Sequence, residues 1–144
     1  MNLIGRVAAL AERTYLERLL GAERPSRPPL FVVGTPRSGT TVVYQHLVHT
    51  FRCAYVPNIS ERVLNAPVLA ARLGRTFAGR KASYQSEFGE TEGALGPSDG
   101  WGLLERWFPR YDLWKSVSEA VDTELPAVIA GFEDVFDAPL FNKN

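Results

Sequence analysis

The sequence predicts an α/β fold built around a parallel sheet, and two observations favour it. Residues 30–33 (Leu-Phe-Val-Val) are apolar throughout, which is typical of a parallel strand buried on both faces. They lead through a glycine-bounded turn into a helical pattern that begins at Thr40, and a second strand-like run follows at residues 53–56. Strands connected through a helix in this way lie parallel and are almost always linked with a right-handed crossover.

The first 24 residues predict a helix that precedes the sheet. Apolar side chains recur at helical spacing over residues 2–20, and Gly21 stands where a C-terminal cap belongs. Three prolines between residues 25 and 29 prevent the helix from continuing and favour an extended entry into the first strand. We expect residues 29–57 to form the strand, loop, helix and second strand.

Residues 60–138 predict a mainly helical region. Ser60 can cap a helix that runs to Leu73 and is closed by Gly74, although Pro67 should kink or split it. Glycines and a proline indicate a mobile surface loop at residues 89–100. Further short helices are expected at residues 101–107, 113–121 and 123–136.

A third strand is expected to start near residues 140–141, so the sheet would hold two or three strands. A parallel sheet of that size is too small to be covered on both faces and stable alone. We therefore expect the chain of 144 residues to be the N-terminal portion of a single domain, truncated after its first half.

Composition narrows the classes of function. Hydrophobic residues make up 45% of the chain, and 16 basic residues balance 16 acidic ones, which is typical of a globular protein and disfavours nucleic-acid and membrane-surface partners. The single cysteine, Cys53, and the lack of a Cys/His cluster disfavour a zinc site. With no signal peptide and no apolar run long enough to span a bilayer, we expect a cytoplasmic protein, and its oligomeric state stays open.

The loop at residues 34–41 carries the clearest chemistry. A strand, a GxxxxG turn and a helix that opens with two threonines form an anion-binding device, because backbone N–H groups and the helix dipole point at the ligand. The residues expected to hold the anion are Gly34, Thr35, Pro36, Arg37, Ser38, Gly39, Thr40 and Thr41.

This loop differs from the loop that binds ATP in P-loop proteins. That motif has a lysine directly after its second glycine, to reach the β- and γ-phosphates. Here Thr40 takes the lysine position, and the positive charge is Arg37, in the middle of the loop. The sequence therefore indicates a phosphate-type ligand that is handled differently from ATP.

The string Gly-Thr-Pro-Arg-Ser-Gly-Thr-Thr after an apolar strand resembles the 5′-phosphosulfate-binding loop of the PAPS-dependent sulfotransferases. The segment Asn142-Lys143-Asn144 is similar to one that these enzymes place before their 3′-phosphate-binding strand. The resemblance implies a P-loop NTPase-like three-layer α/β/α fold, 3′-phosphoadenosine 5′-phosphosulfate (PAPS) as co-substrate and no metal. It also implies that Arg37 binds the transferring sulfonate, and that the acceptor is a hydroxyl or amine of a small molecule, carbohydrate or lipid.

Glu61 is the candidate for the base that the acceptor hydroxyl requires. It follows the second strand, whose carboxyl end should lie alongside the loop, and tyrosine-protein sulfotransferases have a catalytic glutamate at a similar point. Ser60 and Glu61 are equally how an ordinary helix begins, with a cap and a first-turn acid.

Two other functions stay open. A P-loop kinase or nucleotide hydrolase with a divergent loop would need Mg²⁺ and an acidic partner at the end of a second strand. An inactive fragment that retains an anion-binding loop is the other alternative.

Overall fold

The structure is a computed structural model that describes residues 3–21, 28–35, 37–77, 86–87, 90–108 and 121–143. Over these residues the chain is a mixed α/β protein, mostly helical, with a small two-stranded parallel sheet. Most of the helix expected at residues 113–121 lies outside the described residues. The elements are α1 (Leu3–Leu20), β1 (Leu30–Val32), α2 (Thr40–Thr50), α3 (Asn58–Arg62), α4 (Pro67–Phe77), β2 (Ser86–Glu87), β3 (Glu90–Thr91), α5 (Trp101–Leu104), α6 (Val121–Phe136) and β4 (Phe141–Lys143).

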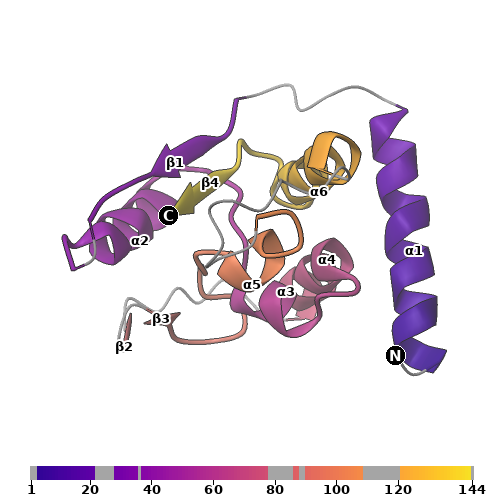
Figure 1. The fold of residues 1–144 in the computed structure, drawn as a ribbon. Helices are drawn as coiled ribbons and strands as arrows, with labels where there is room; N and C mark the ends of the chain where they lie inside the picture. Colours follow the sequence, from indigo (N-terminus) through magenta and orange to yellow (C-terminus); the bar gives the residue numbers. More distant parts are fainter. Residues whose placement is uncertain are drawn as a thin grey trace.

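The strand β4 lies between β1 and the run at residues 53–56. It pairs with β1 in parallel, with Leu30 opposite Phe141 (Figure 1). The Phe141 N–H donates to the Ala54 carbonyl at 2.8 Å, and Ala54 forms one parallel bridge with Leu140. The third strand near residues 140–141 is thus confirmed. The expected second strand is reduced to a single bridge, and its neighbour is β4 rather than β1.

Side chains on the two faces of this sheet enter two separate clusters, because successive residues of a strand point to opposite faces. Phe141 faces α2, whereas Leu140 packs with residues of α4, α5 and α6. Burial raises the pKa of the Cys53 thiol on the α2 side to about 11. The buried residues on the α2 side are Tyr44, Val48 and Cys53, and those on the other side are Ala54, Val56, Val68, Ala71, Leu103, Trp107, Val128, Phe132 and Leu140.

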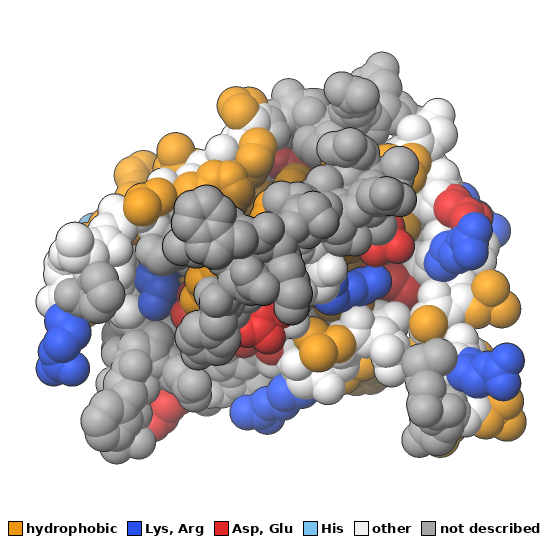
Figure 2. Space-filling view, in the orientation of Figure 1, with side chains coloured by type: hydrophobic (Ala, Val, Ile, Leu, Met, Phe, Trp, Pro, Cys, Tyr) orange, Lys and Arg blue, Asp and Glu red, His pale blue; other side chains and the backbone are white. Residues whose placement is uncertain are grey.

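The strand β1 is less buried than the sequence indicates. Phe31 is 46% exposed and Val33 is 74% exposed, so the expectation of a strand buried on both faces is wrong. Within the described residues β1 has a paired neighbour only in β4, which leaves its other edge open. Figure 2 shows hydrophobic side chains gathered over β1 and α2, where Val42 and Val43 are also exposed.

The helix expected from Ser60 to Leu73 is split into α3 and α4 at Pro67, as the proline implied. Proline is well suited to the first position of a helix, where its missing N–H has no partner to lose. Ser60 does not cap α3. Its buried hydroxyl donates to the Pro67 carbonyl at 2.7 Å and ties the two helices together. The helix α4 also continues past Gly74, to Phe77.

The end of the glycine-rich segment packs into the molecule instead of forming a mobile surface loop. Thr91 and Ser98 are buried, and Gly89 lies outside the described residues. The Ser98 N–H donates to the Val56 carbonyl at 2.8 Å, and the Asn58 N–H donates to the Gly96 carbonyl at 2.9 Å. These bonds hold the segment against the carboxyl end of residues 53–56.

The helices expected at the two ends of the chain are confirmed as α1 and α6, and they pack against each other (Figure 1). Glu12 of α1 is only 5% exposed. Its carboxylate accepts hydrogen bonds from the Val68 and Leu69 N–H groups at 2.8 and 2.9 Å. Glu12 therefore caps the N-terminus of α4 from a distant part of the chain.

We expect Glu12→Ala to lower the free energy of unfolding by about 1–3 kcal/mol, because two N–H groups of α4 lose their acceptor. Denaturation by urea measures this. The control is Glu17→Ala, which removes an exposed i,i+4 ion pair with Arg13 and should cost at most about 1 kcal/mol. Equal losses in the two variants would contradict the capping role.

Glu12 should also make stability depend on pH. Desolvation raises the pKa of this carboxyl above its ordinary value of 4.5, although the two backbone N–H groups act in the opposite direction. Between 4.5 and the raised pKa the folded state holds more protons than the unfolded state, so the free energy of unfolding falls as pH rises through that window. Glu12→Gln should flatten this part of the curve of stability against pH, and an unchanged slope would show that Glu12 titrates normally.

Candidate functional site

The loop between β1 and α2 is a tight turn with two left-handed residues. The Ser38 N–H donates to the Thr35 carbonyl at 3.1 Å. Gly39 has a φ of 84°, and Arg37 has a φ of 63°. A side chain in this region costs about 1–2 kcal/mol, so Arg37 is held there against its own preference. Such strain is concentrated at binding and catalytic sites.

Gly34 allows the loop to fold back on itself. A Cβ at this position would lie 2.5 Å from Cγ2 of Thr40 and 2.7 Å from Oγ of Ser38. A side chain here would require Thr40 or Ser38 to shift, so this close approach favours glycine. The structure therefore gathers Gly34, Ser38 and Thr40 as the sequence predicts, whereas Pro36 lies outside the described residues.

The N-terminus of α2 opens onto this loop. The first helical bond runs from the Val43 N–H to the Gly39 carbonyl, at 3.1 Å. Among the described residues no side chain caps the helix at Gly39. Gly39 has no side chain that could cap the helix, and the dipole of an 11-residue helix favours an anion at this end.

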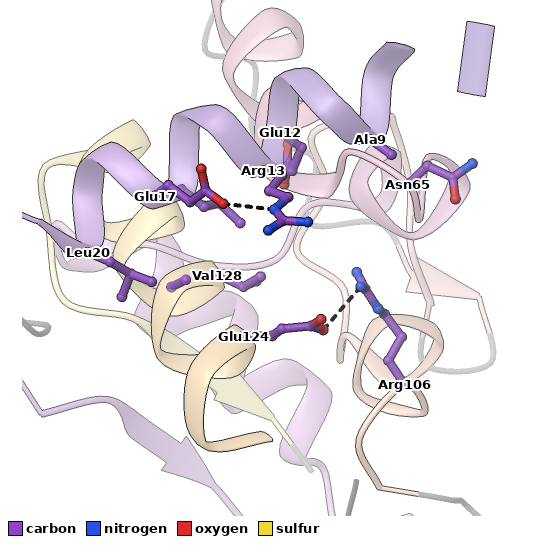
Figure 3. A pocket seen from close by; sticks show the side chains of 11 residues that line it. Ala9, Glu12, Arg13, Glu17, Leu20, Asn65, Arg106, Glu124 and Val128 are labelled. Atoms are coloured by element: carbon purple, nitrogen blue, oxygen red, sulfur yellow. Dashed lines mark hydrogen bonds and ion pairs between the residues drawn. The ribbon is translucent and has the colours of Figure 1, made fainter. Parts of the chain in front are cut away.

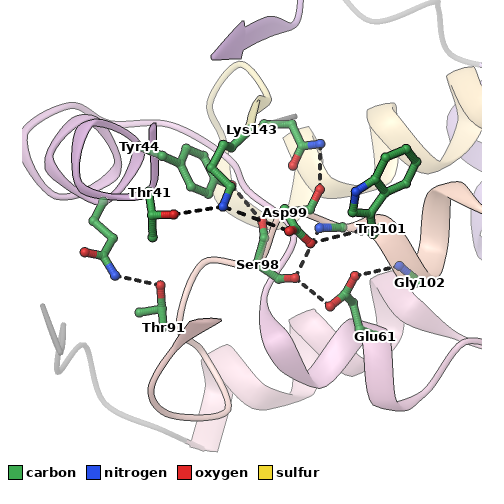
Figure 4. A network of polar contacts seen from close by, with 12 residues as sticks. Thr41, Tyr44, Glu61, Thr91, Ser98, Asp99, Trp101, Gly102 and Lys143 are labelled. Atoms are coloured by element: carbon green, nitrogen blue, oxygen red, sulfur yellow. Dashed lines mark hydrogen bonds and ion pairs between the residues drawn. The ribbon is translucent and has the colours of Figure 1, made fainter. Parts of the chain in front are cut away.

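Lys143 is a second cation at this site, although the sequence indicates it only as part of the segment Asn142-Lys143-Asn144. Its Nζ donates to Oγ1 of Thr41 at 3.0 Å and lies 4.0 Å from Oδ2 of Asp99 (Figure 4). Its side chain is 12% exposed. The available signal was its place in the expected third strand, because parallel strands end at the same edge of a sheet.

Glu61 hydrogen-bonds Ser98 and Gly102, which lie outside the loop. Its Oε2 accepts the Ser98 hydroxyl at 2.6 Å, and its Oε1 accepts the Gly102 N–H at 2.9 Å. The second bond lies in the first turn of α5, so the carboxylate stabilises that helix start. Glu61 was expected to follow a strand that pairs directly with β1. In the structure β4 lies between β1 and residues 53–56, so the segment before Glu61 is one strand further from the loop.

A chain of polar contacts joins Glu61 to the loop (Figure 4). Asp99 follows Ser98, and its carbonyl accepts Nδ2 of Asn142 at 3.0 Å. The Tyr44 hydroxyl of α2 donates to the Ser98 carbonyl at 3.2 Å. Burial raises the pKa of Tyr44, which keeps this hydroxyl protonated as a donor. Residues from α2, α3 and β4 therefore all fix the position of residues 98–99.

A hollow of about 520 Å³ lies elsewhere, between α1 and α6 (Figure 3). Its charged walls form the ion pairs Arg13–Glu17, at 2.8 Å, and Arg106–Glu124, at 3.4 Å. Since these charges already neutralise each other, they select no class of ligand. Figure 1 shows α1 and α2 on opposite sides of the molecule, so this hollow is separate from the loop.

Comparison of the chain with protein-family models, with curated proteins and with solved structures gives no match. Within the described residues no group of three or more His, Cys, Asp or Glu side chains is arranged to hold a metal ion. Over the same residues none of the helices has the length and apolar character to cross a membrane.

We expect Gly39→Ala to lower the free energy of unfolding by about 1–2 kcal/mol, because it places a Cβ at a φ of 84°. The matched control is Gly21→Ala, where a Cβ would make only ordinary 3.7 Å contacts with carbonyl oxygens of α1. Thermal or urea unfolding of the two variants tests this, and an Ala at 39 that is as stable as an Ala at 21 would refute the left-handed turn.

Proposed function

We propose that this chain is part of a PAPS-dependent sulfotransferase with a P-loop NTPase-like three-layer α/β/α fold. The observation that carries the proposal is the uncapped N-terminus of α2, preceded by a loop in which Arg37 is exposed and left-handed. An exposed arginine beside free N–H groups suits a planar or tetrahedral anion better than it suits an ordinary turn.

The proposed reaction is transfer of a sulfonate group from PAPS to an acceptor hydroxyl or amine. The bond between sulfur and the acceptor oxygen or nitrogen forms as the bond between sulfur and the bridging phosphate oxygen breaks, in line. As in phosphoryl transfer, catalysis rests on positioning and on stabilising charge. Arg37, Lys143 and the N–H groups of α2 would offset the charge on the leaving bisphosphate, so the proposed mechanism uses no metal.

Glu61 takes the acceptor proton in this proposal. One of its oxygens accepts the Ser98 hydroxyl, so it would exchange that hydrogen bond for one from the acceptor. The acceptor is a small molecule, a carbohydrate or a lipid with a free hydroxyl, and the reaction takes place in the cytoplasm.

A nucleotide kinase or hydrolase is the second candidate, and Lys143 is the observation that favours it. Its ammonium lies beside Thr41 and could approach a phosphate chain although the loop lacks a lysine. That function requires Mg²⁺ and a nucleoside triphosphate. Dependence of binding on Mg²⁺ therefore separates the two candidates.

Calorimetric titration of PAPS and of adenosine 3′,5′-bisphosphate, with and without Mg²⁺, tests the proposal. We expect metal-independent binding that Arg37→Ala weakens about 10-fold or more, because a hydrogen bond to a charged group contributes about 1.5–3 kcal/mol. Arg6→Ala, which removes the same charge from exposed α1, is the control and should leave affinity unchanged.

Three outcomes would contradict the sulfotransferase. They are no binding of PAPS to a folded chain, equal binding by wild type and Arg37→Ala, and tighter binding of Mg²⁺–ATP than of PAPS. The last of these would support the kinase or hydrolase instead.

A further inference from the structure

The side chain of Lys143 is largely buried, at 12% exposed, so the groups around its ammonium are important for its charge. A charge in such a place needs a counter-charge or several hydrogen bonds. Among the described residues, Asp99 is the acidic side chain that pairs with it, at 4.0 Å, and Thr41 accepts its hydrogen bond at 3.0 Å.

Asp99 is fixed by contacts on both sides of its own backbone. Its Oδ1 accepts the Trp101 N–H at 3.3 Å, which leaves Oδ2 directed at Lys143. Its carbonyl accepts Nδ2 of Asn142, at 3.0 Å. Since Asn142 and Lys143 are adjacent in β4, the same strand sets the position of both Asp99 and Lys143.

Ser98, the residue before Asp99, is held by a separate set of hydrogen bonds. The Ser98 hydroxyl donates to Glu61 at 2.6 Å and accepts the Gly100 N–H at 3.1 Å. Ser98 is 7% exposed, so these bonds are shielded from water. Glu61 therefore helps to hold the residue that precedes Asp99.

We propose that Asp99 is a positioning residue that sets the anion affinity of the loop through Lys143. This inference rests on the proposed anion site at residues 34–41. In the ligand-free site Asp99 is the counter-ion of Lys143. An anion at the N-terminus of α2 attracts the same ammonium, so the free energy of binding is reduced by the weakened contact with Asp99.

A moderated affinity suits the proposed reaction. The bisphosphate product is an anion, and it must leave the site after each transfer. Product release limits the rate of many group-transfer enzymes. An acidic side chain that competes for one of the two cations shortens the time for which the product stays bound.

The experiment is calorimetric titration of adenosine 3′,5′-bisphosphate into wild type, Asp99→Asn, Lys143→Met and the double variant. We expect Asp99→Asn to bind about two- to fivefold more tightly, the range for a partly exposed ion pair. Lys143→Met should bind about 10-fold more weakly. In the Lys143→Met background, Asp99→Asn should change affinity by less than about 1.5-fold if it acts through Lys143.

Asp137→Asn is the matched control, because it removes one negative charge from an exposed ion pair with Arg52 and should leave affinity unchanged. Damage to the fold would weaken binding, so tighter binding is a readout that a purely structural role of Asp99 does not produce. Circular dichroism checks the fold of each variant. Asp99→Ser serves as a second neutral variant if Asp99→Asn does not fold.

Unchanged or weaker binding by a folded Asp99 variant overturns the inference, and so does tightening that persists without Lys143. If Arg37→Ala weakens binding while the Asp99 and Lys143 variants match wild type, the anion loop stands and this inference alone fails. If folded wild type binds no bisphosphate, both fail.

Discussion

The hydrogen bonds that hold β4 between β1 and residues 53–56 are the constraint on which the rest of the structure depends. The Leu30 N–H donates to the Leu140 carbonyl, and the Phe141 N–H donates to the Ala54 carbonyl, both at 2.8 Å. They divide the core into two clusters, one on each face of the sheet. They also bring Lys143 beside α2, more than a hundred residues from Thr41 in sequence.

Charge at the candidate site is therefore assembled from two distant parts of the chain. Arg37 is fixed locally by its turn, whereas Lys143 depends on the register of β4. One residue earlier in the same strand, Asn142 holds Asp99, so a slip of β4 by one position would exchange the two side chains between the faces of the sheet. The register of β4 thus sets the positions of both Lys143 and its counter-ion Asp99.

Local patterns predicted the local features. Helical spacing over residues 2–20 predicted α1, and the two glycines around Arg37 predicted a tight turn, whereas the left-handed backbone of Arg37 was not predicted. The strand that pairs with residues 53–56 could not be predicted, because nothing near Ala54 in sequence encodes pairing with Leu140. The prediction that Ser60 caps a helix was wrong for a related reason, since its hydroxyl donates to the Pro67 carbonyl and not to its own helix start. The partners of Glu61 and Lys143 lie 37 and 102 residues away, beyond any helical or strand period.

The single cysteine adds a consequence of a different kind. Cys53 is 6% exposed and lies next to Ala54, the residue that forms the bridge with Leu140 just before β4. A thiol with a pKa of about 11 is protonated at neutral pH, and alkylating reagents react with thiolates. Its rate of modification under native conditions therefore reports how often this part of the sheet opens to solvent.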